Sequence, residues 1–135
     1  MMIWATDCAA QTIPPPPANA LILFGARWCA PCTVELRGIA QLDAALADLP
    51  APARPRLVLA WIDQPAAPPA RFAQMRCRVM LAPPLWAAAW AEAHYATAHG
   101  LPFAVLEDSA GRACAIHPGP LTGPDVAQMW AQCRP

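Results

Sequence analysis

The sequence predicts a single α/β domain in which a central mixed β-sheet carries helices on both faces. Short apolar runs alternate with helical patterns in the first half of the chain, and a hairpin pattern occupies the second half. The 135 residues are enough for one core, and 57% hydrophobic with 13% charged residues is typical of a globular chain. The formal net charge is zero without any charged block, so nothing favours nucleic acid or an anionic membrane as a partner.

A proline-rich lead-in precedes the expected domain. Residues 1–19 read as irregular, and their run Pro14 to Pro17 should adopt an extended polyproline conformation. We therefore expect the domain to occupy residues 20–135. The longer uncharged stretches are interrupted by prolines, so no membrane span is expected.

The first half of the domain predicts a strand, a helix and a second strand. Leu21 to Gly25 and Leu57 to Ile62 indicate buried strands, because their apolar side chains are consecutive rather than alternating. From Ala30 to about Leu49 apolar residues recur at helical spacing, and a proline falls in the first turn, where its missing N–H costs little. A short helix or irregular piece is expected from Ala70 to Met80.

The second half predicts a helix, a hairpin and a last helix. Leu85 to His99 follows two prolines, which can start a helix, and a glycine ends it. Phe103 to Glu107 and Arg112 to Ile116 indicate hairpin strands, because the residues between them have turn chemistry. Thr122 is an N-cap candidate with an aspartate three residues on, which predicts a helix to about Gln132. Two parallel strands joined by a crossover helix and followed by a hairpin give a mixed sheet.

The segment Trp28-Cys29-Ala30-Pro31-Cys32 carries the chemistry, because it lies where a strand gives way to a helix. Two cysteines separated by two residues can close a disulfide and open it again. At a helix N-terminus the dipole and the free N–H groups favour the thiolate, which is the reactive form. We therefore expect Cys29 to be the exposed nucleophile and Cys32 the resolving thiol, with this redox-active disulfide in place of a bound cofactor and with no metal site.

Four further cysteines lie outside this motif and show no second C-x-x-C, so spacing gives little support for a zinc site. Cys77 and Cys114 are interpreted as buried free thiols that act as small hydrophobes. Cys8 and Cys133 lie near the termini and could be reactive, pair with each other or have no role. Four spare thiols favour a reducing compartment.

The motif resembles a known active site. W-C-A-P-C-T-V-E-L, from Trp28 to Leu36, is similar to the W-C-x-P-C-x-x-E motif of TlpA/ResA-type thiol–disulfide oxidoreductases in the thioredoxin superfamily. Gly100 to Arg112 resembles the family's G-[VIL]-P-x-x-[FV]-[LV]-[IE]-D…G-R segment, and His117 to Thr122 resembles its lead into the last helix. The resemblance covers roughly Leu21 to Met129 and implies a thioredoxin-like fold.

The resemblance also implies roles for residues near the cysteines. Pro102 would be a cis-proline that faces them, which leaves the backbone of Leu101 free to pair with a substrate peptide in strand fashion. Trp28 and Pro31 complete the substrate-binding residues implied for the motif.

Glu35 follows Cys32 by three residues, at the place where this branch carries a glutamate that tunes the cysteines. A carboxylate there raises a thiol pKa when charged, or accepts a proton from Cys32 when partly buried. Thioredoxins themselves carry an acidic residue six positions before the first cysteine. That place is Leu23 here, which departs from thioredoxin and agrees with the TlpA/ResA branch.

The function implied is that of a thiol–disulfide oxidoreductase, an enzyme. The internal Pro31 is found in reducing members of the superfamily, so reductase is favoured over oxidase. Its partners would be protein disulfide or dithiol substrates and an electron-donor thiol protein, and the chain is expected to be a monomer. The branch implies substrates such as the cysteines of apocytochrome c during cytochrome c maturation, or copper-assembly proteins, in an exported compartment.

The compartment and two other functions stay open at this point. As written, the chain shows no leader and would be cytoplasmic, whereas a start further upstream would place it in the periplasm, as the resemblance implies. The same scaffold could serve as a binding or adaptor module without turnover. The cysteine pair could also hold copper(I), since soft thiolates suit that ion.

Overall fold

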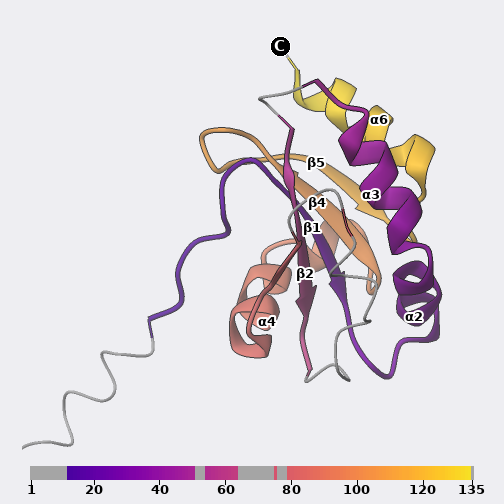
Figure 1. Cartoon of the computed structure of the whole chain (residues 1–135). Coiled ribbons are helices and arrows are strands. Elements are labelled where there is room, and N and C mark those ends of the chain that lie inside the picture. The colour runs from indigo at the N-terminus through magenta and orange to yellow at the C-terminus, as the bar shows by residue number, and fades with distance from the viewer. Residues whose placement is uncertain (1–11, 51–53, 64–74, 76–78, 135) are drawn as a thin grey trace, which may run out of the picture.

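The computed structural model describes residues 12–50, 54–63, 75 and 79–134. Its elements in chain order are β1 (Ala20–Gly25), α2 (Ala30–Arg37), α3 (Ile39–Ala47), β2 (Arg56–Trp61), β3 (Val79–Leu81), α4 (Pro84–Glu92), α5 (Tyr95–Ala98), β4 (Phe103–Glu107), β5 (Ala113–Pro118) and α6 (Gly123–Cys133). The strands form one sheet in the order β3-β2-β1-β4-β5 (Figure 1).

Strand β1 is the centre of this sheet. It pairs in parallel with β2 and antiparallel with β4, and all six of its residues are buried. The outer strands extend the parallel pairing on one side and the antiparallel pairing on the other, because β3 is parallel to β2 and β5 is antiparallel to β4. The predicted mixed sheet is therefore confirmed, and the consecutive apolar residues of β1 are explained by burial on both faces.

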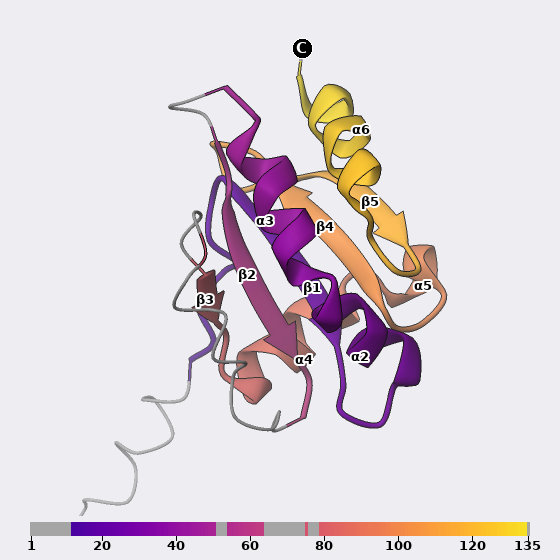
Figure 2. The ribbon, with the colours of Figure 1, turned by 45° about the vertical axis from the view of Figure 1, so that its right-hand side comes forward.

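Two layers of helices cover the two faces of the sheet, as predicted. Helices α2, α3 and α6 lie on one face, and α4 lies on the other (Figures 1 and 2). Successive residues of β1 point into different cores: Leu21 and Leu23 join the core under α3 and α6, whereas Ile22 and Phe24 join the core under α4. In the second core the ring of Phe24 stacks on Phe103, with centroids 4.6 Å apart.

The expected helix from Ala30 to Leu49 is two helices, α2 and α3. The break falls at Gly38, whose amide donates to the carbonyl of Glu35 at 3.0 Å. Glycine costs about 1 kcal/mol relative to alanine inside a helix, so an interruption there is inexpensive. The apolar spacing predicts the helical conformation of both segments correctly, but it does not reveal an interruption of one residue between them.

Two other expectations are wrong in part. The expected helix from Leu85 to His99 is divided into α4 and α5, and it ends where His99 adopts the left-handed conformation with φ of 62°. The end of the piece expected from Ala70 to Met80 is strand β3, which pairs with β2. Three residues at a sheet edge carry too little periodicity to identify a strand. Residues 70–74 and 76–78 lie outside the described part.

The proline-rich lead-in is attached to the domain in its described part. The indole Nε1–H of the buried Trp90, on α4, donates to the carbonyl of Pro14 at 2.8 Å. Ile13 packs against the same core. Within the residues described, no helix has the length and apolar character needed to cross a membrane.

Candidate active site

The motif lies in a loop that the neighbouring parallel strand anchors. Where β1 ends, the Gly25 carbonyl accepts from the Ile62 amide at 2.9 Å. Two residues on, the Arg27 amide donates to both carboxylate oxygens of Asp63, at 2.9 and 3.0 Å. The loop is thereby held at the carboxyl end of the sheet. Trp28 follows on this loop and is 72% exposed.

Cys29 and Cys32 are joined by a disulfide, with their Cα atoms 5.3 Å apart. Cys29 is the N-cap of α2, and its Sγ accepts a hydrogen bond from the Cys32 amide at 3.2 Å. This is the place of a side-chain cap, so a thiolate at Cys29 would receive both the N–H donor and the positive end of the helix dipole.

The expectation that Cys29 is exposed is wrong for this disulfide form. Cys29 is 5% exposed and Cys32 is 1% exposed, so Cys29 is the outer member of the pair but offers only a narrow approach. A cysteine in a helix cap turns its sulfur back toward the backbone N–H groups, and this position removes it from solvent.

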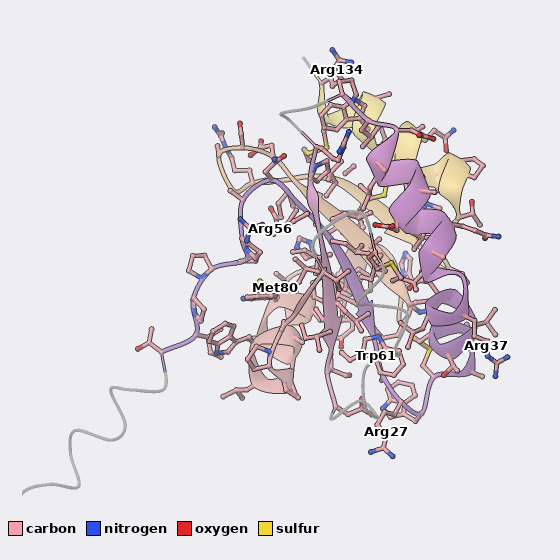
Figure 3. All side chains as sticks on the ribbon, in the orientation of Figure 1. Arg27, Arg37, Arg56, Trp61, Met80 and Arg134 are labelled. Carbon is pink, nitrogen blue, oxygen red and sulfur yellow. A yellow bond between two sulfur atoms is a disulfide. The ribbon has the colours of Figure 1, made fainter. Side chains whose placement is uncertain are left out.

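Trp61 is a neighbour of the pair that the sequence analysis did not identify. It ends β2 opposite Gly25 and is 6% exposed (Figure 3). A Cβ atom placed on Gly25 would lie 2.8 Å from Trp61 Nε1 and 3.2 Å from Cys32 Cβ. Gly25 therefore leaves the space in which the indole approaches the resolving cysteine. The register of the parallel strands, which sequence alone does not give, creates this contact.

Glu35 shares a helix face with Cys32, and these two are the buried residues of α2. A spacing of three residues places side chains next to each other on a helix. Burial raises the pKa of Glu35 to about 7, while the hydrogen bond from the Leu121 amide acts in the opposite direction. Near neutral pH this carboxyl group can therefore hold or release a proton beside the resolving cysteine.

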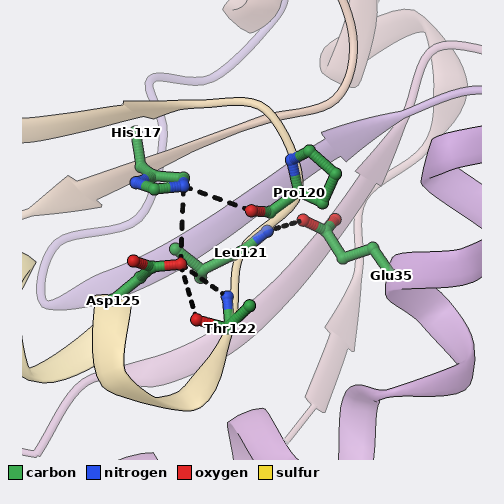
Figure 4. Close-up of polar contacts among 6 residues, drawn as sticks. All are labelled: Glu35, His117, Pro120, Leu121, Thr122 and Asp125. Carbon is green, nitrogen blue, oxygen red and sulfur yellow. Dashed lines mark hydrogen bonds and ion pairs between the residues drawn. The ribbon is translucent and has the colours of Figure 1, made fainter.

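The loop between β5 and α6 connects Glu35 with the segment around Pro102. The Leu121 amide donates to Glu35 Oε2 at 2.6 Å (Figure 4). Two residues earlier, the Gly119 amide donates to the Pro102 carbonyl at 2.9 Å. A single short loop thus holds both the carboxylate and the proline segment.

The N-terminus of α6 fixes the other side of this loop. The Asp125 carboxylate accepts from the amide of Thr122 at 2.9 Å, as the predicted cap requires, and also from the Thr122 hydroxyl at 2.7 Å (Figure 4). These bonds, the Thr122 hydroxyl first, lower the pKa of Asp125. His117 lies 3.6 Å from the same carboxylate. Leu121, which directly precedes the N-cap Thr122, is therefore held next to the start of α6.

Pro102 is buried, and the Leu101–Pro102 peptide bond is cis. Phe103 pairs with Phe24 in the antiparallel register, so Pro102 lies at the end of the sheet where β1 leads into the motif. Within the described residues, the amide and carbonyl of Leu101 make no backbone hydrogen bond. The backbone of Leu101 is thus available at the edge of the site.

The residues named from the sequence therefore gather at one end of the sheet. Cys29, Cys32 and Glu35 come from the start of α2, and Leu101 and Pro102 lead into β4. Trp28 and Pro31 are exposed on the motif itself. Within the described ranges, no three His, Cys, Asp or Glu side chains are grouped as a metal site would need.

The other cysteines differ from expectation. Cys114 is not a free thiol, because it forms a disulfide with Cys133, with Cα atoms 5.1 Å apart. This bond also excludes a pair between Cys8 and Cys133. The two residues are 19 positions apart and lie on a strand and a helix, so only the packing of α6 against β5 brings them together. Cys8 and Cys77 lie outside the described residues.

The fold is similar to that of several solved structures. StoA from Bacillus subtilis aligns with a TM-score of 0.54 at 18% identity, over 85% of both chains. A thioredoxin-family thiol:disulfide interchange protein from Chlorobium tepidum aligns with a TM-score of 0.56 at 18% identity, over 85% of this chain and 80% of its own. A DsbF homologue from Corynebacterium diphtheriae aligns with a TM-score of 0.56 at 18% identity, over 84% of this chain and 72% of its own.

At these identities the likeness shows a shared fold. No protein-family model matches the chain, and no curated protein sequence matches it.

Gly25→Ala should disturb the site directly. The new Cβ would lie 2.8 Å from the Trp61 indole, so we expect a loss of about 1–3 kcal/mol in the free energy of unfolding, measured by urea denaturation. Gly38→Ala is the matched control, because its nearest contact is 3.5 Å and its φ of −90° suits alanine. Its stability should stay within about 1 kcal/mol of the parent. Equal losses in the two variants would contradict the close contact.

Glu35 should make stability depend on pH. Its pKa is raised from 4.5 to about 7, so the folded chain binds more protons than the unfolded chain in this window. The free energy of unfolding should therefore fall as pH rises from about 4.5 to about 7, by about 3 kcal/mol in total for this group. Glu35→Gln should remove that fall from urea denaturation curves recorded across the window.

Glu107 provides a matched comparison for Glu35. Burial, followed by the charge of Asp108, raises its pKa to about 7 as well. It pairs with Ala20 at the far end of β1, so the two carboxyl groups are remote from each other. Glu107→Gln should flatten part of the same pH dependence, and the effects of the two substitutions should add. A curve unchanged by Glu35→Gln would contradict the raised pKa of Glu35.

Proposed function

We propose that this chain, which has the thioredoxin fold that the sequence predicted, is a thiol–disulfide oxidoreductase that reduces protein disulfides. The observation that carries the proposal is Cys29 as the N-cap of α2, joined to Cys32 and accepting the Cys32 amide at 3.2 Å. A cap of this kind stabilises a thiolate, and a thiolate is what attacks a disulfide.

The reaction begins from the reduced pair. The Cys29 thiolate attacks one sulfur of the partner's disulfide, and a bond forms between Cys29 and the partner while the partner's second sulfur leaves as a thiolate and takes a proton. Cys32, as a thiolate, then attacks Cys29 Sγ. This step releases the first partner sulfur and leaves the Cys29–Cys32 disulfide. The partner gains two electrons and two protons, and the chain loses them.

Glu35 supports the second step. Cys32 is 1% exposed, so its proton has little access to water, whereas Glu35 lies one helical turn away with a pKa of about 7. Ionised Glu35 takes the proton from Cys32 as the mixed disulfide is resolved. An electron-donor dithiol protein then reverses the sequence by attacking Cys29 and restores both thiols.

The surroundings suit a protein substrate. Trp28, which directly precedes Cys29, is an apolar side chain with 72% exposure. Leu101 adds a backbone amide and carbonyl that can pair with an extended peptide in strand fashion. Hydrogen bonds to the backbone of a bound peptide do not depend on its side chains, so this mode of binding accepts substrates of many sequences. Such binding suits an enzyme that exchanges disulfides with proteins.

Reduction of insulin disulfides tests the enzyme. The parent chain should catalyse it with dithiothreitol as donor, and Cys29→Ser should abolish the catalysis. Cys32→Ser should also lose turnover but accumulate a covalent mixed disulfide, because Cys29 still attacks and no thiol resolves the bond. Absence of turnover in the parent would refute the proposal. The midpoint potential decides the direction, since a value near about −120 mV belongs to a strong oxidant and would contradict a reductase.

Glu35→Gln should slow the release of the mixed disulfide. General-base assistance contributes about 10²–10⁴-fold, so we expect release at pH 7 to fall by about 10²-fold, measured by rapid quenching and mass spectrometry. The formation of the mixed disulfide should change much less. Glu107→Gln is the control, because its carboxyl group is also buried with a pKa of about 7 but lies at the far end of the sheet. Equal effects of both variants on release would contradict the assigned role.

A further inference from the structure

The Cys114–Cys133 disulfide joins the second residue of β5 to the last residue of α6. Cys114 lies toward the Glu107 end of β4 in the antiparallel register, whereas Pro102 lies at the other end. Pro102 and Glu107 are five residue steps apart along this strand, which corresponds to about 16 Å. The two disulfides found among the described residues are therefore at opposite ends of the sheet.

The segment closed by this disulfide contains the loop that holds the site. Gly119 donates to the Pro102 carbonyl and Leu121 donates to Glu35, and both residues lie between Cys114 and Cys133. Helix α6 transmits the constraint, because it begins directly after this loop and packs along its length against α3 and β5 (Figure 2). A bond that fixes the end of α6 therefore limits the motion of the Leu121 amide.

We propose that the Cys114–Cys133 disulfide is a permanent cross-link that stays oxidised while Cys29–Cys32 cycles, and that it positions the Leu121 amide against Glu35. The second half of this inference rests on the function proposed above. The cross-link forms when the two thiols pass two electrons and two protons to a low-molecular-weight disulfide such as oxidised glutathione, which is reduced to two thiols.

The positions of the two pairs on their helices account for the difference. Cys29 caps the N-terminus of α2, where the helix dipole favours a thiolate and so favours the reduced pair. Cys133 ends α6, where the dipole has the opposite sign and disfavours a thiolate. The adjacent Arg134 supplies a positive charge, but its guanidinium lies 5.7 Å over the Trp130 ring. Reduced Cys133 therefore lacks the thiolate stabilisation that a helix N-terminus gives Cys29, so reduction of the cross-link is less favourable than reduction of Cys29–Cys32.

A persistent cross-link indicates an oxidising compartment, because disulfides that are not catalytic rarely survive in a reducing cytosol. This replaces the expectation of a reducing compartment, which assumed that Cys114 and Cys133 were free. The reductase would then work where protein disulfides form, and its electrons would come from a dedicated donor rather than from the thiol pool of that compartment.

The parent chain itself tests the first half. Protein refolded with oxidised glutathione is equilibrated in dithiothreitol buffers of increasing reducing strength, alkylated and mapped by mass spectrometry. Cys114 and Cys133 should become labelled only at a thiol-to-disulfide ratio at least ~10-fold higher than Cys29 and Cys32 require. Labelling of both pairs together, earlier labelling of Cys114 and Cys133, or free thiols at these positions after refolding would overturn the proposal. This result does not depend on insulin reduction, so it is independent of the proposed function.

A variant without the cross-link tests the second half. In Cys114→Ala/Cys133→Ala, amide hydrogen exchange at Leu121 should be at least ~10-fold faster than in the parent, while the centre of β1 keeps its protection. The effect of Glu35→Gln on the release of the mixed disulfide should also be smaller in this variant. Unchanged exchange at Leu121, or an equal effect of Glu35→Gln, would show that the cross-link does not position the site. If the variant does not fold, exchange at Leu121 is compared instead between the parent with only Cys29–Cys32 reduced and the parent with both pairs reduced: at least ~10-fold faster exchange in the second form supports the positioning role, and equal exchange overturns it.

Discussion

The architecture depends on the pairing of β1 with a parallel strand on one side and an antiparallel strand on the other. Parallel pairing brings the carboxyl end of β2 beside the end of β1, so Trp61 and Asp63 meet the loop that carries the cysteines. Antiparallel pairing brings the start of β4, with its cis-proline, to the same place. One buried strand thus assembles a site from three separate parts of the chain.

The hydrogen bond between Leu121 and Glu35 completes that assembly at an energetic cost. A buried carboxyl group is retained only if its charged form is partly compensated, and here the only hydrogen-bond donor described for it is one backbone amide at 2.6 Å. One bond leaves the carboxyl poised between its charged and neutral forms near neutral pH. A fully paired carboxylate would be more stable but could not exchange a proton with Cys32. In the mechanism proposed above, the site would keep a destabilising group because the second step uses its proton exchange.

Local patterns in the sequence predicted a large part of this organisation. The strands at Leu21–Gly25 and Phe103–Glu107 were identified because consecutive apolar residues between turn signals mean burial, and the capped start of α6 because Thr122 and Asp125 have the required spacing. The break between α2 and α3 at Gly38 was not predicted, because a single glycine does not alter the helical periodicity of the apolar residues.

The rest of the site depends on contacts between residues distant in the sequence. Trp61 lies 36 positions from Gly25, and Leu121 lies 86 positions from Glu35; only the strand register and the packing of α6 bring each pair together. The partnership of Cys114 with Cys133 is of the same kind, because cysteine spacing does not determine connectivity.

The hydrogen bond from Trp90 to the Pro14 carbonyl also attaches the segment before β1 to the second core. Trp90 lies on α4 and is buried, so a shortened protein that started at β1 would remove the acceptor of its indole N–H and would uncover the apolar surface that Ile13 contacts. The seven residues before β1, from Ile13 to Asn19, thus cover part of the second core. The prolines in this segment favour its attachment, because they restrict the unfolded chain and so reduce the conformational entropy lost on folding.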